Sequence, residues 1–302
     1  MQKFQLRLRN TFIGALIIAS IMFGCNNDES LTPEQSKAKT EVAAQDNSEI
    51  LAATQEVLDV TSIALLEKGV SNGRTSSGGR LSEHGFNCYP TISANYDVKK
   101  TADSLVYSGT ISIDFGDGSS CEDSTKVRSG KITDVFRLVV TYNDSIPLRS
   151  TEVITFENYK KDSVELDGLF TSSYSSDGTY AVDINDATLT YEDGTSANWS
   201  GSLVYLYDNK GTHHWNDDTK TLSGSLNGTT REGDKFTTEI TKDILFSYEC
   251  EGKHDVPVSG TVSLTVGGTT SEVDYGDGTC DRIYSITANG ETTEYTFGKK
   301  NS

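Results

Sequence analysis

The sequence predicts a mainly β fold: one large antiparallel domain, either a sandwich or a curved, partly closed barrel, preceded by one amphipathic helix. From about residue 86 onward, short segments rich in Val, Ile, Thr, Tyr and Phe alternate with polar residues, which is the pattern of strands. Asp-Gly and Asn-Gly pairs separate these segments, and the chain has only 4 prolines to interrupt them. About a dozen strands result, more than a twisted open sheet holds without curling or splitting. Two tandem subdomains are the alternative arrangement.

The first 24 residues have the form of a secretory signal peptide. Residues 3–9 carry three basic side chains, and an apolar or small-residue stretch runs from Phe12 to Gly24. The stretch is shorter than the ~20 residues that cross a bilayer. Cys25 follows directly, and this junction resembles the lipobox of bacterial lipoproteins, in which the cysteine becomes the acylated N-terminus. We therefore expect residues 1–24 to be removed and Cys25 to hold the protein on a membrane. An ordinary signal peptide that contains a cysteine is the alternative.

Between this anchor and the strands the composition changes twice. Residues 25–46 are polar and charged with few large apolar side chains, so we expect a flexible tether. Residues 47–70 carry apolar side chains at helical spacing, and Gly69 stands where a helix would stop. We expect this helix to pack its apolar stripe on the sheet, and a helix that binds a partner is the alternative. Residues 71–85 are rich in Gly, Ser and Arg and predict a loop, and residues 86–298 form the β-rich domain.

The charge of the chain argues against nucleic acid as a partner. The formal net charge is -18, and removing residues 1–24, which carry three positive charges and no negative one, brings it to -18 minus 3, or -21. A phosphate backbone is recognised by a continuous lysine and arginine footprint, which this sequence does not show. An acidic, solvated surface is what the charge predicts.

Four cysteines remain after Cys25, an even number in an exported chain, so disulfides are expected. An internal duplication favours one of the three connectivities. Cys121 ends the run Asp-Phe-Gly-Asp-Gly-Ser-Ser-Cys and Cys280 ends Asp-Tyr-Gly-Asp-Gly-Thr-Cys, each with another cysteine upstream at a similar distance. We therefore predict that Cys88 pairs with Cys121 and Cys250 with Cys280, giving two disulfide-pinned repeat units.

The same two runs contain the candidate metal ligands. Asp114 and Asp117 in the first run, and Asp274 and Asp277 in the second, stand beside glycine turns. Calcium takes about six to eight oxygens from such acidic loops. Neither run has the spacing of an EF-hand loop with its terminal Glu, and the interpretation we favour is a turn in which Asp bonds the local backbone. We expect no cofactor.

The candidate ligand-binding residues are aromatic. Tyr205, Tyr207 and Trp215 border a long loop after the central hairpin and are able to stack on sugar rings, although core packing explains them equally well. The sequence has no Gly-x-Ser-x-Gly elbow and no free cysteine with a histidine partner, so nucleophilic catalysis is not predicted. Paired Asp or Glu residues of a polysaccharide hydrolase are the alternative, but the sequence does not single out a pair.

Several segments of the β-rich region resemble a family of uncharacterised lipoproteins from Bacteroidetes. They are residues 111–116, 128–132, 156–159, 193–199, 224–228 and 273–281. The likeness runs from about Cys88 to Phe297 and implies an envelope protein with a single β domain, without naming a substrate. The acidic run from Asn26 to Glu29 also looks like the export signals that send such lipoproteins to the cell exterior.

Together these patterns predict a non-enzymatic lipoprotein of the cell envelope, located at the outer membrane, with the cell surface and the periplasmic side as the two alternatives for the face on which it lies. Its membrane contact is the acylated Cys25. Its binding partner is a glycan, a lipid or a protein, and the sequence does not choose among them. A surface polysaccharide hydrolase and a purely structural protein are the competing classes.

Overall fold

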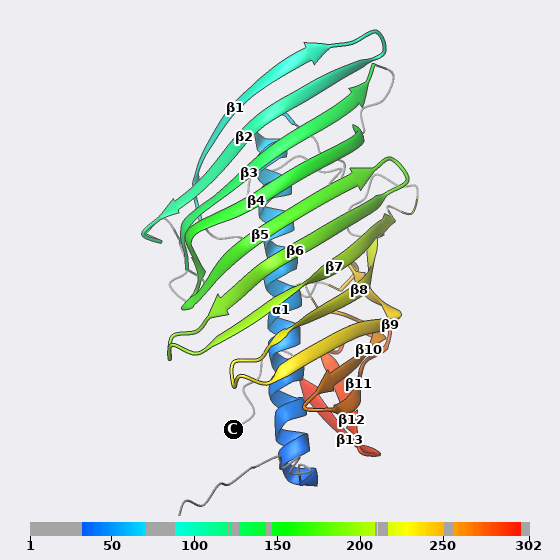
Figure 1. Cartoon of the computed structure of the whole chain (residues 1–302). Coiled ribbons are helices and arrows are strands. Elements are labelled where there is room, and N and C mark those ends of the chain that lie inside the picture. The colour runs from blue at the N-terminus through cyan, green and yellow to red at the C-terminus, as the bar shows by residue number, and fades with distance from the viewer. Residues whose placement is uncertain are drawn as a thin grey trace, which may run out of the picture. The chain divides into compact units, whose positions relative to one another are not determined.

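One long helix and thirteen antiparallel strands make up the described part of the chain (Figure 1). The structure is a computed structural model and describes residues 32–70, 88–119, 121, 127–142, 147–208, 210, 217–250 and 256–296. The expected signal peptide, Cys25, the whole of the 71–85 loop and Trp215 lie outside these residues. The elements are α1 (Pro33–Glu67), β1 (Thr91–Lys100), β2 (Ser104–Gly116), β3 (Arg128–Thr141), β4 (Pro147–Lys161), β5 (Val164–Ser175), β6 (Thr179–Thr190), β7 (Ser196–Asp208), β8 (Thr219–Thr229), β9 (Lys235–Ser247), β10 (Ser259–Val266), β11 (Thr269–Asp277), β12 (Ile283–Ala288) and β13 (Glu291–Thr296).

Helix α1 begins at Pro33, so the prediction of a flexible tether over residues 25–46 is wrong for residues 33–46. Thr32 caps the helix: its hydroxyl accepts a hydrogen bond from the Gln35 backbone N–H at 3.2 Å. The Gln35 side chain accepts the Thr32 N–H at 3.0 Å, which completes a capping box with proline at the first helical position. The sequence Thr-Pro-Glu-Gln carried this signal.

The first turns of α1 pack through short polar side chains rather than large apolar ones. Ser36 and Thr40 are buried, with the Ser36 hydroxyl donating to Thr269 Oγ1 at 3.0 Å and the Thr40 hydroxyl 3.3 Å from that of Ser271. The composition of residues 33–46 predicts a segment that cannot bury a core, because it lacks large apolar side chains. In the structure its small side chains let the helix approach the strands closely. The predicted stop is confirmed, because α1 ends at Glu67 and Gly69 adopts a left-handed φ of 77°.

The strands form a single sheet in which every strand pairs with its neighbours in sequence, in the order β1 to β13. All of the pairings are antiparallel, and the first and last strands are not joined to each other. The predicted class, mainly β with one antiparallel assembly behind one helix, is confirmed. One continuous sheet replaces the alternative of two tandem subdomains, and α1 belongs to the same compact unit, which begins at Thr32.

Bulges and glycines bend this long sheet. Register shifts interrupt the pairing of β3 with β4, β5 with β6, β6 with β7, β8 with β9 and β9 with β10. At the last of these, Gly260 has a φ of 117°, and a Cβ there would lie 2.6 Å from the Asp243 carbonyl oxygen. Bulges increase local twist and let strands turn corners, so the sheet curves instead of splitting.

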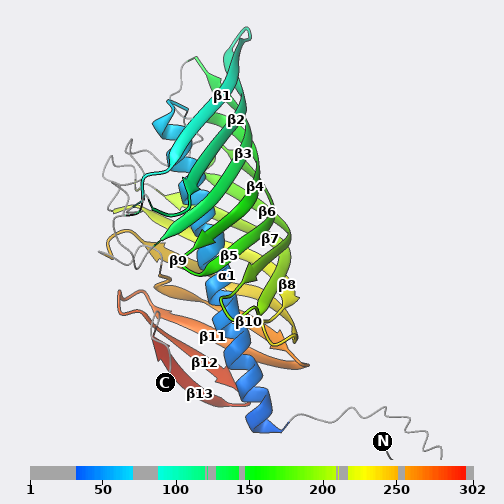
Figure 2. The ribbon, with the colours of Figure 1, turned by 90° about the vertical axis from the view of Figure 1, so that its left-hand side faces the viewer.

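Helix α1 runs along the concave side of the curved sheet, as Figure 2 shows. Residues 54–58 and 60–65 of the helix are all buried, whatever their polarity. On the strands, alternate side chains point toward the helix and form the core, including Trp199, Phe170, Tyr180 and Tyr205. The predicted packing of the helix on the sheet is therefore confirmed, but the buried surface is much wider than one apolar stripe.

Two charged clusters fix the helix to the sheet. In the first, Arg231 from the β8–β9 turn donates to Asp46 Oδ1 and, at 3.0 Å, to Glu49 Oε2. Its guanidinium also lies 3.9 Å from the centre of the Tyr191 ring. Asp46 is fully buried, and a buried carboxylate without a cation would be costly, so this turn is held against α1.

The second cluster surrounds Glu56. Its carboxylate accepts hydrogen bonds from Arg128 Nε at 2.8 Å and from the Tyr159 hydroxyl at 2.9 Å, and it forms an ion pair with Lys161. Burial alone would raise the pKa of Glu56, but the positive charges of Lys161 and Arg128 outweigh burial and hold that pKa below its ordinary value of 4.5. The start of β3 and the end of β4 are thereby fixed to the C-terminal half of the helix.

Replacing this carboxylate should destabilise the protein in a pH-dependent way. We expect Glu56→Gln to lower the free energy of unfolding by about 3 kcal/mol at pH 7, because Arg128 stays buried without its anion. Because the folded-state pKa is depressed, the ionised form stabilises the fold above pH 4.5, and this stabilisation is lost as the pH falls below that value. In urea unfolding, the difference in free energy of unfolding between wild type and Glu56→Gln should be smaller at pH 3 than at pH 7. Glu67→Gln, at the exposed end of the same helix, is the control and should change stability by less than about 0.5 kcal/mol. A gap that is the same at both pH values would contradict the role assigned to Glu56.

The bend at Gly260 gives a second expectation. Gly260→Ala should cost at least about 2 kcal/mol more than Gly194→Ala, because the new methyl group meets the backbone of β9. Gly194 also has a positive φ, 83°, but no atom lies within 4 Å of its added Cβ, so it measures the conformational cost alone. Thermal unfolding of both variants tests this expectation. Equal losses of stability in the two variants would show that the close approach of Gly260 to β9 is unimportant.

Candidate functional site

The structure has an open groove of about 420 Å³ on the outer face of the sheet, across β2, β3 and β4. Three of its side chains, Asp114, Lys131 and Glu157, lie in one row across these strands. Lys131 Nζ is 3.4 Å from Glu157 Oε2, and Lys160, which also lines the groove, pairs with Glu165 at 3.0 Å. The groove therefore offers hydrogen-bonding groups of both charges, all partly exposed.

A double bulge produces the groove. The register shifts between Ser129 and Lys131 in β3 and between Thr155 and Lys160 in β4. Asn158 takes a positive φ of 50°, which turns Tyr159 inward to Glu56 while Glu157 and Asn158 stay at the surface. The same local irregularity thus serves the helix contact on one face of the sheet and the groove on the other.

Sequence reasoning missed Lys131, Glu157, Asn158 and Lys160 as groove residues. A signal was present, because the run Phe-Glu-Asn-Tyr at residues 156–159 breaks the strict alternation of β4. Such a break is typical of a bulge, and bulges often re-aim side chains beside functional sites.

The four candidate metal ligands act as turn residues. Asp114 and Asp117 accept the backbone N–H groups of Gly116 and Ser119, at 2.8 and 3.0 Å. In the second unit, Asp274 and Asp277 accept those of Gly276 and Thr279, at 2.8 and 3.2 Å. Among the described residues, no three His, Cys, Asp or Glu side chains are grouped as a metal site would require. Asp114 and Asp117 do, however, line the groove.

Both predicted disulfides are present, Cys88–Cys121 and Cys250–Cys280. The first encloses the β1–β2 hairpin and the second the β10–β11 hairpin, since each pair of cysteines flanks its two strands. The first bridge lies beside the groove, because Asp117 and Cys121 belong to the same turn region. It thereby restrains one rim of the groove.

The two aromatic candidates that the structure describes, Tyr205 and Tyr207, lie on the inner side of the sheet. Tyr205 is 1% exposed and belongs to the core cluster, so the prediction that it stacks on a sugar is wrong. Tyr207 points to the same inner side and is half-buried against that core. Trp215 lies outside the described residues. Period-two alternation places residues 205 and 207 on one face, but the sequence alone did not say that the face is covered by α1.

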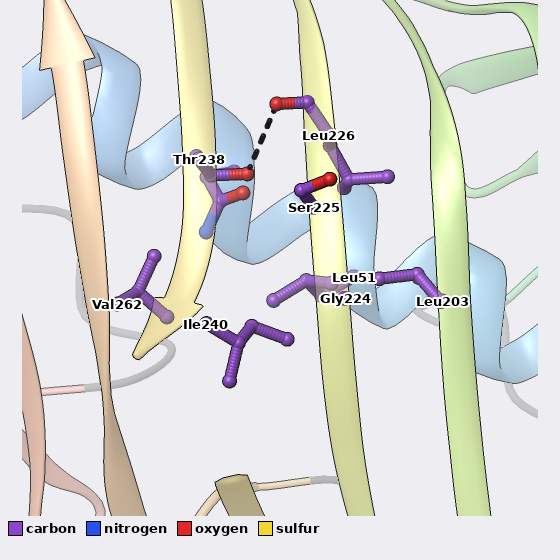
Figure 3. A pocket seen from close by; sticks show the side chains of 9 residues that line it. Leu51, Leu203, Gly224, Ser225, Leu226, Thr238, Ile240 and Val262 are labelled. Carbon is purple, nitrogen blue, oxygen red and sulfur yellow. Dashed lines mark hydrogen bonds between the residues drawn. The ribbon is translucent and has the colours of Figure 1, made fainter. Parts of the chain in front are cut away.

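At the level of Leu51, side chains fill the space between helix and sheet. Figure 3 shows a gap lined by Leu51 of α1 and by Leu203, Leu226 and Val262 of neighbouring strands. The gap leaves no room for a water molecule. The concave face of the sheet thus binds the protein's own helix at this level, and the open groove is on the opposite face.

Comparison with known proteins adds no relative: no family model, no curated protein and no solved structure matches this chain. No helix in the described part of the chain is long and apolar enough to span a membrane.

Proposed function

We propose that this protein is a lipid-anchored, non-catalytic binding module of the bacterial cell envelope, carried on the outer membrane and related to the uncharacterised Bacteroidetes lipoproteins that it resembles. The observation that supports the proposal most directly is that α1 begins only a few residues after Cys25. Cys25 stands only seven positions before the helix cap Thr32, a separation of at most about 25 Å for an extended chain. An acylated Cys25 would therefore hold a stiff body near the membrane instead of a domain on a long flexible tether.

Attachment through Cys25 would place one end of the protein close to the membrane and the other end away from it. The 35 residues of α1 correspond to a length of about 52 Å. The cap end of the helix contacts β11 through Thr269 and Ser271, whereas the Tyr96 hydroxyl of β1 reaches the Lys68 carbonyl oxygen at the other end. The groove on β2–β4 therefore lies toward the end of the helix that is remote from the anchor, where a partner outside the membrane is accessible.

The chemistry of the groove supports binding more than hydrolysis. A glycosidase needs one carboxylic acid whose pKa is raised so that it can protonate the leaving group. Hydrogen bonds from the side chain and backbone of Ser119 instead hold the pKa of Asp117 below its ordinary value of 3.8. Asp114 bonds the backbone and Glu157 pairs with Lys131, so each of the three groove carboxylates already has a local partner.

The filled concave face bears on the class of ligand. A lipid carrier encloses its ligand in an apolar cavity, but α1 occupies this side of the sheet and the gap beside Leu51 does not admit water. An exposed polar groove suits a glycan or a protein surface instead. We therefore favour these two partners over a lipid.

Acylation of Cys25 is the direct test. Cells that express the wild-type protein should incorporate radiolabelled palmitate into it, and the protein should stay in the membrane pellet after alkaline carbonate washing. Cys25→Ser should abolish the label and release the protein, because stable anchoring needs acyl chains on this residue. Asn26→Ser, one residue away, is the control and should leave both readouts unchanged. A Cys25→Ser protein that remains fully membrane-bound would overturn the proposal.

A further inference from the structure

The outer face of β3 and β4 presents two arginines that bond to no other side chain. Arg137 of β3 and Arg149 of β4 are exposed, and among the described residues neither guanidinium has a hydrogen bond or ion pair. Of the other described arginines, Arg128 and Arg231 are engaged by α1, and Arg282 is half-buried. Within the described residues, these two guanidiniums are thus the exposed arginine groups without an ion pair, in a chain of net charge -18.

The sheet register places these two side chains together. Arg137 pairs with Thr151, and Arg149 lies two residues along β4, so the arginines are diagonal neighbours about 7–8 Å apart on one face. The acidic side chains closest to them in sequence, Asp134 and Glu152, are buried on the opposite face. Asp97 shares the row of Arg137 but stands two strands away, about 10 Å, in β1. The pair therefore forms a local positive patch.

An uncharged track along the same strands connects this patch with the groove. Arg137 and the groove residue Lys131 are six positions apart in β3, about 20 Å. Between them, Val135 and Val153 are directly paired and exposed by 51% and 38%. Hydroxyl groups flank this track, from Thr110 beside Val135 to Ser108 and Thr151 beside Arg137.

These groups match a polysaccharide better than a peptide. Because β3 and β4 are interior strands, their backbone groups are bonded on both sides, and a peptide has no free edge to extend. Recognition must come from side chains: hydroxyls for sugar hydroxyls, valine surface for the C–H faces of sugar rings, and guanidiniums for carboxylate or sulfate groups.

We infer that the outer face of β3 and β4, from the groove to Arg137 and Arg149, is a binding site for an anionic glycan, with the two arginines selecting its carboxylate or sulfate groups. This inference rests on the proposed binding function and specifies its ligand class.

The test uses the full-length lipoprotein in detergent micelles, with polygalacturonate and dextran sulfate as anionic probes and neutral dextran for comparison. At low salt the wild type should bind at least one anionic probe, and 0.5 M NaCl should weaken binding because exposed charge pairs are screened. The double variant R137Q/R149Q should raise the Kd at least about tenfold, since two charge-assisted contacts are lost.

The control K235Q/K242Q removes the same charge from exposed positions of β9 and should change the Kd less than about twofold. An equal loss in both double variants, or no binding of either anionic probe, would overturn the inference. Tight binding of poly-L-glutamate with the same arginine dependence would assign the patch to an acidic protein partner and overturn the glycan class. Acylation of Cys25 is measured independently, so the anchoring proposal can stand when this inference fails.

Discussion

The structure depends on burying a charged helix inside a single sheet. Helix α1 carries Asp46 and Glu56 into the interior, where Arg231 of the β8–β9 turn meets Asp46, and Arg128 of β3 and Lys161 of β4 meet Glu56. Removing one partner of such a buried ion pair costs much more stability than the intact pair contributes, because the other charge is left buried alone. These contacts therefore define where the helix can lie. The apolar core then forms between the helix and the inward-facing side chains of the sheet.

The burial of α1 against the sheet also explains why the strands are irregular. A flat sheet of thirteen strands could not wrap a helix, so bulges and glycines bend it where it must curve. At residues 156–159 one such irregularity turns Tyr159 inward to Glu56 and leaves Glu157 and Asn158 outside. The contact of Tyr159 with the helix and the groove on the outer face therefore both result from one backbone distortion. The groove thus lies where the sheet is held against α1.

Much of the fold was predictable because it is local. Alternation, Asp-Gly turns and the duplicated cysteine runs gave the strands and both disulfides. The start of α1 was missed because small polar residues such as Ser36 and Thr40 bury themselves by close approach, which composition does not reveal. The burial of Tyr205 and the exposure of Arg137 and Arg149 depend on which face the helix covers, and that is a long-range property. Neither the groove nor the arginine patch was predictable without the register of β2, β3 and β4.

Native-state hydrogen exchange of the full-length protein in micelles would test the central claim that helix and sheet form one cooperative structure. The predicted result is that amides of residues 54–65 in α1 and of β5–β8 exchange through one opening with a common free energy. If the helix amides exchanged through a much lower barrier while the sheet stayed protected, the sheet would be stable on its own. The helix would then be an accessory to the sheet, and the charged clusters around Glu56 and Arg231 would not organise the fold.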